Sequence, residues 1–321
     1  MTLKQAFDLF IFDRQTFCGD KTIENYENTI RYFIQWLESE RRSTRDQIDL
    51  DSITTSDLKQ YVVWLRNRSS NEQHPFKDPG GKLSARTVRN YTKDLKTFYN
   101  FLAVEGYAED RAASLKVIKA ERKVIIPLSA LDVEELDKYF NLKSATGCRN
   151  YCIVHLMLDA GLRADEVRIL RIQDVNFDNK YIRIRGKGNK ERLVPMARNL
   201  RKYMYEYVYL HRNLVNTDAF FSGSSGHVLT SNGIKSLFAR MRNKTGIDRL
   251  HPHLLRHTFA TCFILGGGSV EMLRILLGHE SINTTQMYMH IASVYEFNEY
   301  PYELDPVFFN TYQRRSPRKR R

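Results

Sequence analysis

The stretch LLGHESINTTQMYMH, residues 276–290, ends an apolar segment in a Gly-His pair and places a tyrosine, Tyr288, nine residues after the histidine, His279. A histidine can donate or accept a proton near neutral pH. A tyrosine hydroxyl, with a pKa of ~10, is a poor nucleophile unless cations lie beside it. The meaning of this stretch therefore depends on the cationic and acid–base side chains that the rest of the chain supplies.

Three other stretches supply such side chains. Arg163 stands beside two acidic residues, Lys187 stands between two glycines, and His253 and Arg256 are three residues apart, on one face of a predicted helix. Taken alone, Arg163 also fits an ordinary surface ion pair, and Lys187 a solvated lysine at a hairpin tip. The stretches are DAGLRADEVRIL (159–170), KYIRIRGKGNKERLVP (180–195) and HPHLLRHTFATCFIL (251–265).

Together these side chains describe one chemical task. Arginine is a fork-shaped donor suited to the non-bridging oxygens of a phosphodiester, and histidine and lysine can move protons. The set suits attack by Tyr288 on a DNA phosphate with no metal and no other cofactor. The chain lacks the compact Asp/Glu cluster that two-metal nucleases need. His253 and His257 have the spacing of a metalloprotease helix, but Leu254 stands where the glutamate is required, so we expect no metal site there.

Four motifs give a specific resemblance. GLRADE, GKGNKERLVP, HPHLLRHTFAT and LLGHESINTTQMYMH match those of the tyrosine recombinases, the phage integrase family, in type, order and spacing over roughly residues 125–292. The chain most resembles the Xer and transposon-integrase branch. One such motif would be modest evidence, whereas four in order are specific. The resemblance implies a mainly α fold with a small β-hairpin or sheet, and two domains: an N-terminal helical core-binding domain and a C-terminal catalytic domain.

The resemblance also implies the phosphate-binding part of the site and the nucleophile. Tyr288 would attack the scissile phosphate, make a 3′-phosphotyrosyl link and leave a free 5′ hydroxyl. Arg163 and Arg256 would bind the phosphate and stabilise the charge that develops on it. Glu166 resembles the acidic residue that supports the first arginine. The implied function is a site-specific DNA recombinase that integrates, excises, inverts or resolves DNA.

Proton transfer is the remaining part of the implied site. Lys187 would be the general acid for the 5′ oxygen that leaves, and His253 would assist proton transfer from the tyrosine. His279 would hydrogen-bond a phosphate oxygen. Because rejoining is the reverse reaction, the bond energy is conserved and no ATP is needed.

Basic charge agrees with a DNA partner. The net charge is +13, and although the last eight residues hold six bases and no acid, the rest of the chain is basic too. In the predicted helix that Ser84 caps, the face opposite the apolar stripe is expected to contact DNA phosphates, although a solvated surface is the alternative reading. That face carries Arg86, Arg89, Lys93 and Lys96. The resemblance implies a homotetramer on double-stranded DNA with a paired inverted-repeat core site, and leaves accessory proteins open.

The chain is expected to divide into four segments. Ile182 and Ile184 alternate with arginines, which predicts a strand, and a Gly-Lys-Gly-Asn turn then leads to a second strand that Pro195 stops. In the tail, Phe308, Phe309 and Tyr312 fit either an anchor in a neighbouring subunit or packing on their own domain. The segments are a helical DNA-binding domain (1–116), a charged linker (117–126), a catalytic domain (127–300) and a tail with a basic end (301–321).

Composition argues against several other classes. Four scattered cysteines are too few for a disulfide framework, and Cys148 and Cys152 lack a second ligand pair for zinc. The N-terminal stretch carries charges within its apolar residues, unlike a signal peptide, and no apolar run approaches the ~20 residues of a membrane span. We expect a cytoplasmic, nucleoid-associated protein with no membrane partner.

Two alternatives to a recombinase stay open at this point. A type IB topoisomerase uses much the same chemistry on one duplex, but the short N-terminal helical domain and the Xer-like GKGNKERLVP turn argue against it. A DNA-binding factor that no longer cleaves would be expected to lack one or more of the six catalytic residues, and all six are present.

Overall fold

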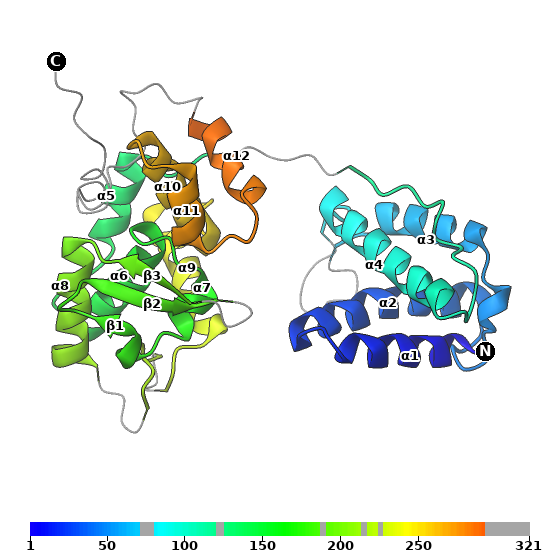
Figure 1. Ribbon diagram of the computed structural model, residues 1–321. Helices are drawn as coiled ribbons and strands as arrows, with labels where there is room; N and C mark the ends of the chain where they lie inside the picture. The colour runs from blue at the N-terminus through cyan, green and yellow to red at the C-terminus, as the bar shows by residue number, and fades with distance from the viewer. Residues whose placement is uncertain (71–79, 120–124, 187–190, 213–216, 224–226, 293–321) are drawn as a thin grey trace, which may run out of the picture. The chain divides into compact units, whose positions relative to one another are not determined.

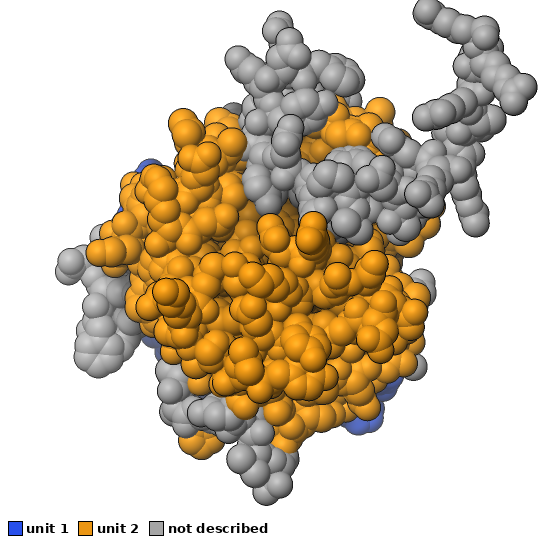
Figure 2. All heavy atoms as spheres, turned by 90° about the vertical axis from the view of Figure 1, so that its left-hand side faces the viewer, with its two compact units in different colours: residues 1–123 blue, residues 124–321 orange. Residues whose placement is uncertain are grey.

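The protein is described by a computed structural model that forms two compact units, residues 1–123 and 124–321 (Figures 1 and 2). The division falls within the stretch predicted as a linker. Both units are mostly helical and the second contains one small antiparallel sheet, which confirms the predicted fold class. None of the described helices is long and apolar enough to cross a membrane. The described residues are 1–70, 80–119, 125–186, 191–212, 217–223 and 227–292.

Unit 1 is a helical bundle around an aromatic core. Thr54 and Ser84 cap the third and fourth helices through their hydroxyls, as the sequence predicted for Ser84. The apolar faces of the second and fourth helices point inward, as predicted for the fourth; Phe33 and Phe98, for example, are fully buried. The elements are α1 (Leu3–Gln15), α2 (Asp20–Arg41), the 3₁₀ turn η1 (Leu50–Ser52), α3 (Thr55–Asn67) and α4 (Ala85–Val104).

Unit 2 is built around helix α6, whose residues from Gly147 to Leu158 are all buried. A helix that is buried on every side must be covered on every side, and α6 packs against both α8 and α10. Helix α10 in turn packs against α11 and α12. The helices are α5 (Ala130–Lys138), α6 (Ala145–Leu158), α7 (Ala164–Arg168), α8 (Arg198–Glu206), α9 (Ser231–Thr245), α10 (Pro252–Leu265), α11 (Val270–Leu277) and α12 (Asn283–Ala292), with short turns η2 (Ile172–Asp174) and η4 (Tyr207–His211).

The sheet has the strand order β1-β2-β3 and is antiparallel throughout. The predicted hairpin is formed by β2 (Tyr181–Arg185) and β3 (Glu191–Pro195), and buried Ile182 pairs with buried Val194. Strand β1 (Val175–Asn176) adds to the other edge of β2. It was not predicted, because two residues are too short to show an alternating pattern.

Candidate active site

A cleft of about 960 Å³ in unit 2 brings together segments that are far apart in the sequence. It lies between α7, the ends of β2 and β3, and the C-terminal end of α11 with the turn into α12. Arg163, Glu166, Arg192 and His279 are among its lining residues. The cleft therefore contains three of the four predicted stretches, and the fourth, on α10, contributes buried side chains behind it.

Glu166 organises the arginines along this cleft. Its two carboxylate oxygens accept hydrogen bonds from Arg192 Nη1 at 2.9 Å and Nη2 at 2.8 Å, from Arg163 Nη1 at 2.9 Å and from the Arg163 backbone N–H at 2.8 Å. Burial by itself raises the pKa of the Glu166 carboxyl, but these bonds from Arg192 and Arg163 outweigh it and hold the pKa below its ordinary value. The carboxylate therefore stays ionised and fixes the orientation of both guanidinium groups.

Arg192 belongs to this cluster but was not predicted from the sequence to be a site residue. Its side chain is buried, and besides the two bonds to Glu166 its Nε donates to the Leu276 carbonyl at 2.7 Å. It thus ties strand β3 to both α7 and the end of α11. A signal was available, because Arg192 lies in the quoted GKGNKERLVP motif, but in that motif only Lys187 was assigned a role.

Arg256 reaches the cluster from the first turns of α10. Its side chain is buried and donates to the Gly161 carbonyl at 2.5 Å, to the Leu277 carbonyl at 2.7 Å and to His279 Nε2 at 3.1 Å. Burial, followed by the repulsion of Arg163, lowers the pKa of Arg256 to about 9. The group remains a cation near neutral pH, in a setting where an incoming anion would be stabilised.

Two glycines allow the backbone carbonyls to approach the arginines. Gly161 has φ +65°, and a Cβ there would lie 2.5 Å from the Phe259 ring. Gly278 has φ +62°, and a Cβ there would lie 3.0 Å from Arg192. The Gly161 carbonyl accepts from Arg256, and the Gly278 carbonyl accepts from Arg163 Nη2 at 3.3 Å. Both positions require the left-handed backbone that glycine adopts without strain.

His279 connects Arg256 to helix α12. A guanidinium can only donate, so His279 Nε2 is the acceptor of the bond from Arg256. Burial, followed by Arg256 and other nearby arginines, lowers the pKa of His279 to about 4, so the ring is neutral and carries its proton on Nδ1. That Nδ1–H donates to the buried Thr285 hydroxyl at 2.9 Å. In this arrangement Nε2 has no proton to donate to a phosphate.

Tyr288 lies on the inner face of α12, one turn after Thr285, and is only 2% exposed. Its hydroxyl is 2.7 Å from Nδ1 of His257. Burial raises the pKa of Tyr288 to about 12, even though Arg256 and Arg163 both act to lower it. The phenol is therefore protonated near neutral pH and packed against α10. From the sequence, His257 was notable only for its metalloprotease-like spacing from His253, and contact with Tyr288 was not predicted.

The two residues predicted to move protons have different positions. His253 is exposed near the start of α10, and partial desolvation with the neighbouring Arg256 and Arg163 lowers its pKa. Within the described residues no hydrogen bond joins His253 to Tyr288. Lys187 lies outside the described residues, as do Phe308, Phe309 and Tyr312 of the tail.

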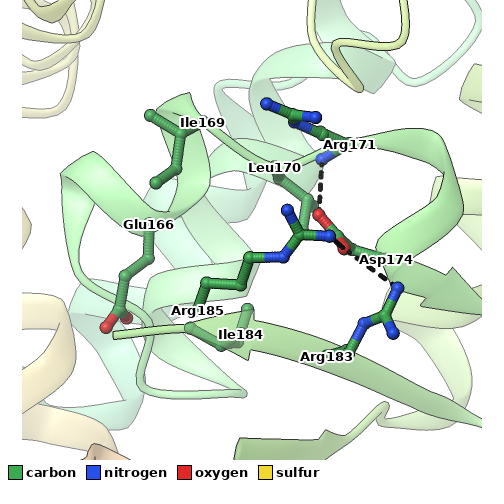
Figure 3. A pocket seen from close by; sticks show the side chains of 8 residues that line it. All are labelled: Glu166, Ile169, Leu170, Arg171, Asp174, Arg183, Ile184 and Arg185. Carbon is green, nitrogen blue, oxygen red and sulfur yellow. Dashed lines mark hydrogen bonds and ion pairs between the residues drawn. The ribbon is translucent and has the colours of Figure 1, made fainter. Parts of the chain in front are cut away.

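The strand that leads towards Lys187 is held by a second charged cluster (Figure 3). Asp174, which is buried, accepts from Arg185 Nη2 at 3.3 Å and from the Arg171 backbone N–H at 3.3 Å, and pairs with Arg183 Nη2 at 3.5 Å. Figure 3 shows the Arg183 and Arg185 side chains meeting at Asp174, with Glu166 on the other side of a small cavity. The Asp174 cluster thus holds β2 through Arg183 and Arg185, and the Glu166 cluster holds β3 through Arg192.

The predicted DNA-contacting side chains lie on α4 in unit 1. Arg86 and Lys93 are exposed and Arg89 is half-buried. Lys96 differs, because its ammonium donates to the carbonyls of three residues after the helix, at 2.9, 2.6 and 3.1 Å. Its three N–H donors are thus in use, and we leave Lys96 out of the proposed DNA surface. The three carbonyls belong to Ala112, Ala113 and Leu115.

Comparison with family models gives two matches that follow the division of the chain. The model described as "Phage integrase family" matches residues 115–294, which is more than half of the chain. The model described as "Phage integrase, N-terminal SAM-like domain" matches residues 5–109. The two matches thus cover both units.

Similar proteins are found among both sequences and solved structures. The tyrosine recombinase XerC of Oceanobacillus iheyensis is 31% identical over 282 residues, covering 84% of this chain and 86% of that protein. The tyrosine recombinase XerD of Listeria innocua is 27% identical, covering 85% and 89%. A Tn1549 transposon integrase in complex with a circular intermediate DNA superposes with a TM-score of 0.71 at 19% identity, covering 90% of this chain and 95% of the other.

A second solved structure, the XerH site-specific recombinase bound to a palindromic difH substrate, superposes with a TM-score of 0.65 at 21% identity, covering 88% and 79%. At this identity the structural likeness concerns the fold. The predicted resemblance is confirmed by the family match, over residues 115–294, and by the XerC relative, which covers 84% of this chain. This chain belongs to the phage integrase family and is a tyrosine recombinase.

Proposed function

We propose that this recombinase cuts and rejoins DNA by attack of Tyr288 on a scissile phosphate held between Arg163 and Arg256. The observation that carries the proposal is the convergence of these three residues in unit 2, with both arginines anchored and the phenol packed on α10 next to Arg256. Fixed guanidinium groups at one cleft suit a phosphodiester, and the protonated phenol supplies the nucleophile.

The reaction exchanges one ester for another. The Tyr288 oxygen forms a bond to phosphorus, the bond from phosphorus to the 5′ oxygen breaks, and Arg163 and Arg256 stabilise the charge on the non-bridging oxygens. Lys187 protonates the leaving 5′ oxygen, and His253 assists the transfer of the tyrosine proton. The reverse reaction rejoins the strands, so the bond energy is kept in the 3′-phosphotyrosyl link.

His279 has a conditional role in this proposal. Its Nε2 accepts from Arg256 in the DNA-free protein and has no proton to give. A phosphate that takes over the Arg256 donors would free Nε2 and, by adding negative charge, favour a protonated ring. His279 would then donate to a phosphate oxygen, as the resemblance implies.

The proposed partner is double-stranded DNA in the cytoplasm. The net charge of +13 and the exposed Arg86 and Lys93, with the half-buried Arg89, support contacts to the phosphate backbone. The XerH structure contains a palindromic difH substrate, which supports paired inverted-repeat sites, and the family resemblance leads us to propose a homotetramer acting on them. These backbone contacts carry no sequence information and leave the identity of the site open.

A trapping experiment tests the proposal and requires no defined target sequence. The full chain is mixed with pooled genomic fragments without divalent metal, complexes are trapped in denaturant, and the attached DNA is sequenced. We expect a covalent adduct with wild type and none with Tyr288→Phe, which removes only the hydroxyl. An adduct that persists in Tyr288→Phe would assign the nucleophile to another residue.

The recovered sequences separate the candidate functions. Reads that converge on an inverted repeat support site-specific recombination. Scattered reads would instead favour a type IB topoisomerase activity on single duplexes. Tight DNA binding with no adduct under all conditions would reduce the protein to a non-cleaving DNA-binding factor.

A further inference from the structure

His257 has no role in the proposed reaction, yet it is the residue that the candidate nucleophile contacts. Its Nδ1 lies 2.7 Å from the Tyr288 hydroxyl, and the two rings are 5.4 Å apart, tilted by 47°. His253 lies one helical turn earlier on α10, on the same side of the helix. The described contacts thus join the phenol to the second of these two histidines.

The charge states of the two partners allow the Tyr288 hydroxyl to be the donor and His257 Nδ1 the acceptor. Burial, followed by the neighbouring His253 and His251, lowers the pKa of His257 to about 4, so the imidazole is neutral and has one nitrogen free to accept. The pKa of Tyr288 is raised to about 12 by burial, so the phenol keeps its proton. With the ring proton on Nε2, the hydroxyl donates to Nδ1.

We propose that His257 is a further catalytic residue, which holds the Tyr288 hydroxyl through Nδ1 and accepts its proton during attack. The inference rests on the proposed function, because it takes Tyr288 as the nucleophile. As the bond from the phenolic oxygen to phosphorus forms, the phenolic proton moves to Nδ1. The 5′ oxygen leaves and takes a proton from the general acid assigned to Lys187. Rejoining reverses both transfers, so protons balance over the cycle.

Binding of DNA would make His257 a better base. Arg256 is among the groups that lower the pKa of His257, and Arg256 is also a proposed phosphate ligand. A phosphate at Arg256 offsets that positive charge and raises the pKa of the neighbouring imidazole. The proton acceptor would thereby be activated by the substrate on which it acts.

Substitutions can separate holding from proton acceptance. In His257→Asn the amide oxygen takes the place of Nδ1, which keeps a hydrogen-bond acceptor without basicity, whereas His257→Leu removes both. The measured quantity is the single-turnover rate of adduct formation on the DNA recovered by trapping. We expect His257→Asn to be slower than wild type by about 10²–10⁴-fold, the range for loss of a general base, with DNA binding little changed.

A more acidic nucleophile distinguishes a proton acceptor from a residue with only a structural role, because it should restore the cleavage rate only when proton acceptance has been lost. A fluorotyrosine of lower pKa at position 288 needs less help in losing its proton, so it should recover His257→Asn by about tenfold or more. His253→Asn serves as the comparison on the same helix, because the proposed function gives His253 an assisting role in the transfer of the same proton. If the fluorotyrosine rescues His253→Asn and not His257→Asn, or if His257→Asn cleaves as fast as wild type, the proposal is wrong.

Failure of this inference is distinguishable from failure of the proposed function. If wild type itself forms no adduct, the proposed function fails, and the inference is then judged on the DNA-free protein. There, nitrogen NMR of histidine-labelled protein should show an unprotonated, hydrogen-bonded Nδ1 in His257 that changes in Tyr288→Phe. A protonated Nδ1 that donates to the phenol would overturn the proposed proton transfer.

Discussion

The proposed anion-binding half of the site and the proposed nucleophile half are held in very different ways. In the first, the Glu166 carboxylate accepts four hydrogen bonds from Arg163 and Arg192, and Arg256 donates to two backbone carbonyls. In the second, α12 packs against α10 and α11, and two side-chain hydrogen bonds are added, one between the Tyr288 phenol and His257 and one from His279 to Thr285. The proposed phosphate site is thus held by charged hydrogen bonds before DNA binds, whereas the proposed nucleophile is held by apolar packing and by two neutral hydrogen bonds.

The difference has a physical reason. Buried charges must be paired and hydrogen-bonded on all sides, so the arginine half tolerates little movement. A neutral hydrogen bond contributes only about 0.5–1.5 kcal/mol net, so the tyrosine half can exchange its partners at small cost. We expect substitutions in the arginine half to affect the stability of unit 2 and those in the tyrosine half to affect mainly the rate of cleavage.

Glu166→Gln should have the largest effect on stability. It leaves Arg163, Arg192 and Arg256 without their shared counter-charge, and loss of one partner from a buried ion pair costs about 3–5 kcal/mol. Urea unfolding of the full chain measures the loss. Asp165→Asn is the matched control, because its exposed pair with Arg168 should contribute only about 0–1 kcal/mol. Equal losses in the two variants would contradict a difference between the clustered and the exposed carboxylate.

Arg192→Met should separate positioning from binding. Arg192 anchors Glu166 and the end of α11, so its loss shifts the phosphate ligands rather than removing them. Misplacement of reacting groups by about 1 Å can cost 10²-fold in rate, and we expect a fall of this order in adduct formation with a much smaller change in DNA affinity. Arg192→Lys keeps the charge but not the two-pronged bond, so it should be impaired as well. Full activity in Arg192→Lys would mean that charge alone is required.

Acid should weaken the tyrosine half before the arginine half. His257 and His279 have pKa values lowered from 6.5 to about 4, so between these values the unfolded chain binds protons that the folded protein does not. Their contribution to stability is complete above about pH 6.5 and falls as the pH drops towards 4. The Glu166 contribution, with a pKa below its ordinary value, is lost only at lower pH.

Melting temperatures measured from pH 7.5 to pH 4.5 test this order. His279→Asn removes one of the two titrating rings and should melt with a shallower pH dependence than wild type. An unchanged slope in His279→Asn would mean that this histidine is protonated equally in the folded and unfolded states.

Thr285→Val should have the smallest effect. It replaces the hydroxyl that His279 Nδ1 contacts with a methyl group of similar size, so it removes one neutral hydrogen bond worth about 1 kcal/mol. Chemical unfolding provides the measurement, and Thr284→Val, at an exposed position on the same helix, is the control. A loss as large as that of Glu166→Gln would show that the two halves are held equally firmly.

The sequence was sufficient for the features that depend on residues near one another in the chain. The apolar stripe of α4, the cap at Ser84 and the alternation in β2 follow from local periodicity and side-chain chemistry, which depend only on residues close together in the chain. The family was likewise predictable, because four motifs with fixed residue types occur in one order. These motifs also limited the candidate site to a few named side chains.

Partners between elements were decided only by the tertiary structure. Packing of α10 against α12 selects His257, not His253, as the contact of Tyr288, although both histidines follow the same periodicity. Because β3 lies close to α7, Arg192 is a buried partner of Glu166. Backbone carbonyls within residues 112–115 accept the hydrogen bonds of the Lys96 ammonium. Hydrogen bonds act over about 3 Å in space and not along the chain, so residue spacing identifies candidate groups but cannot pair them across elements.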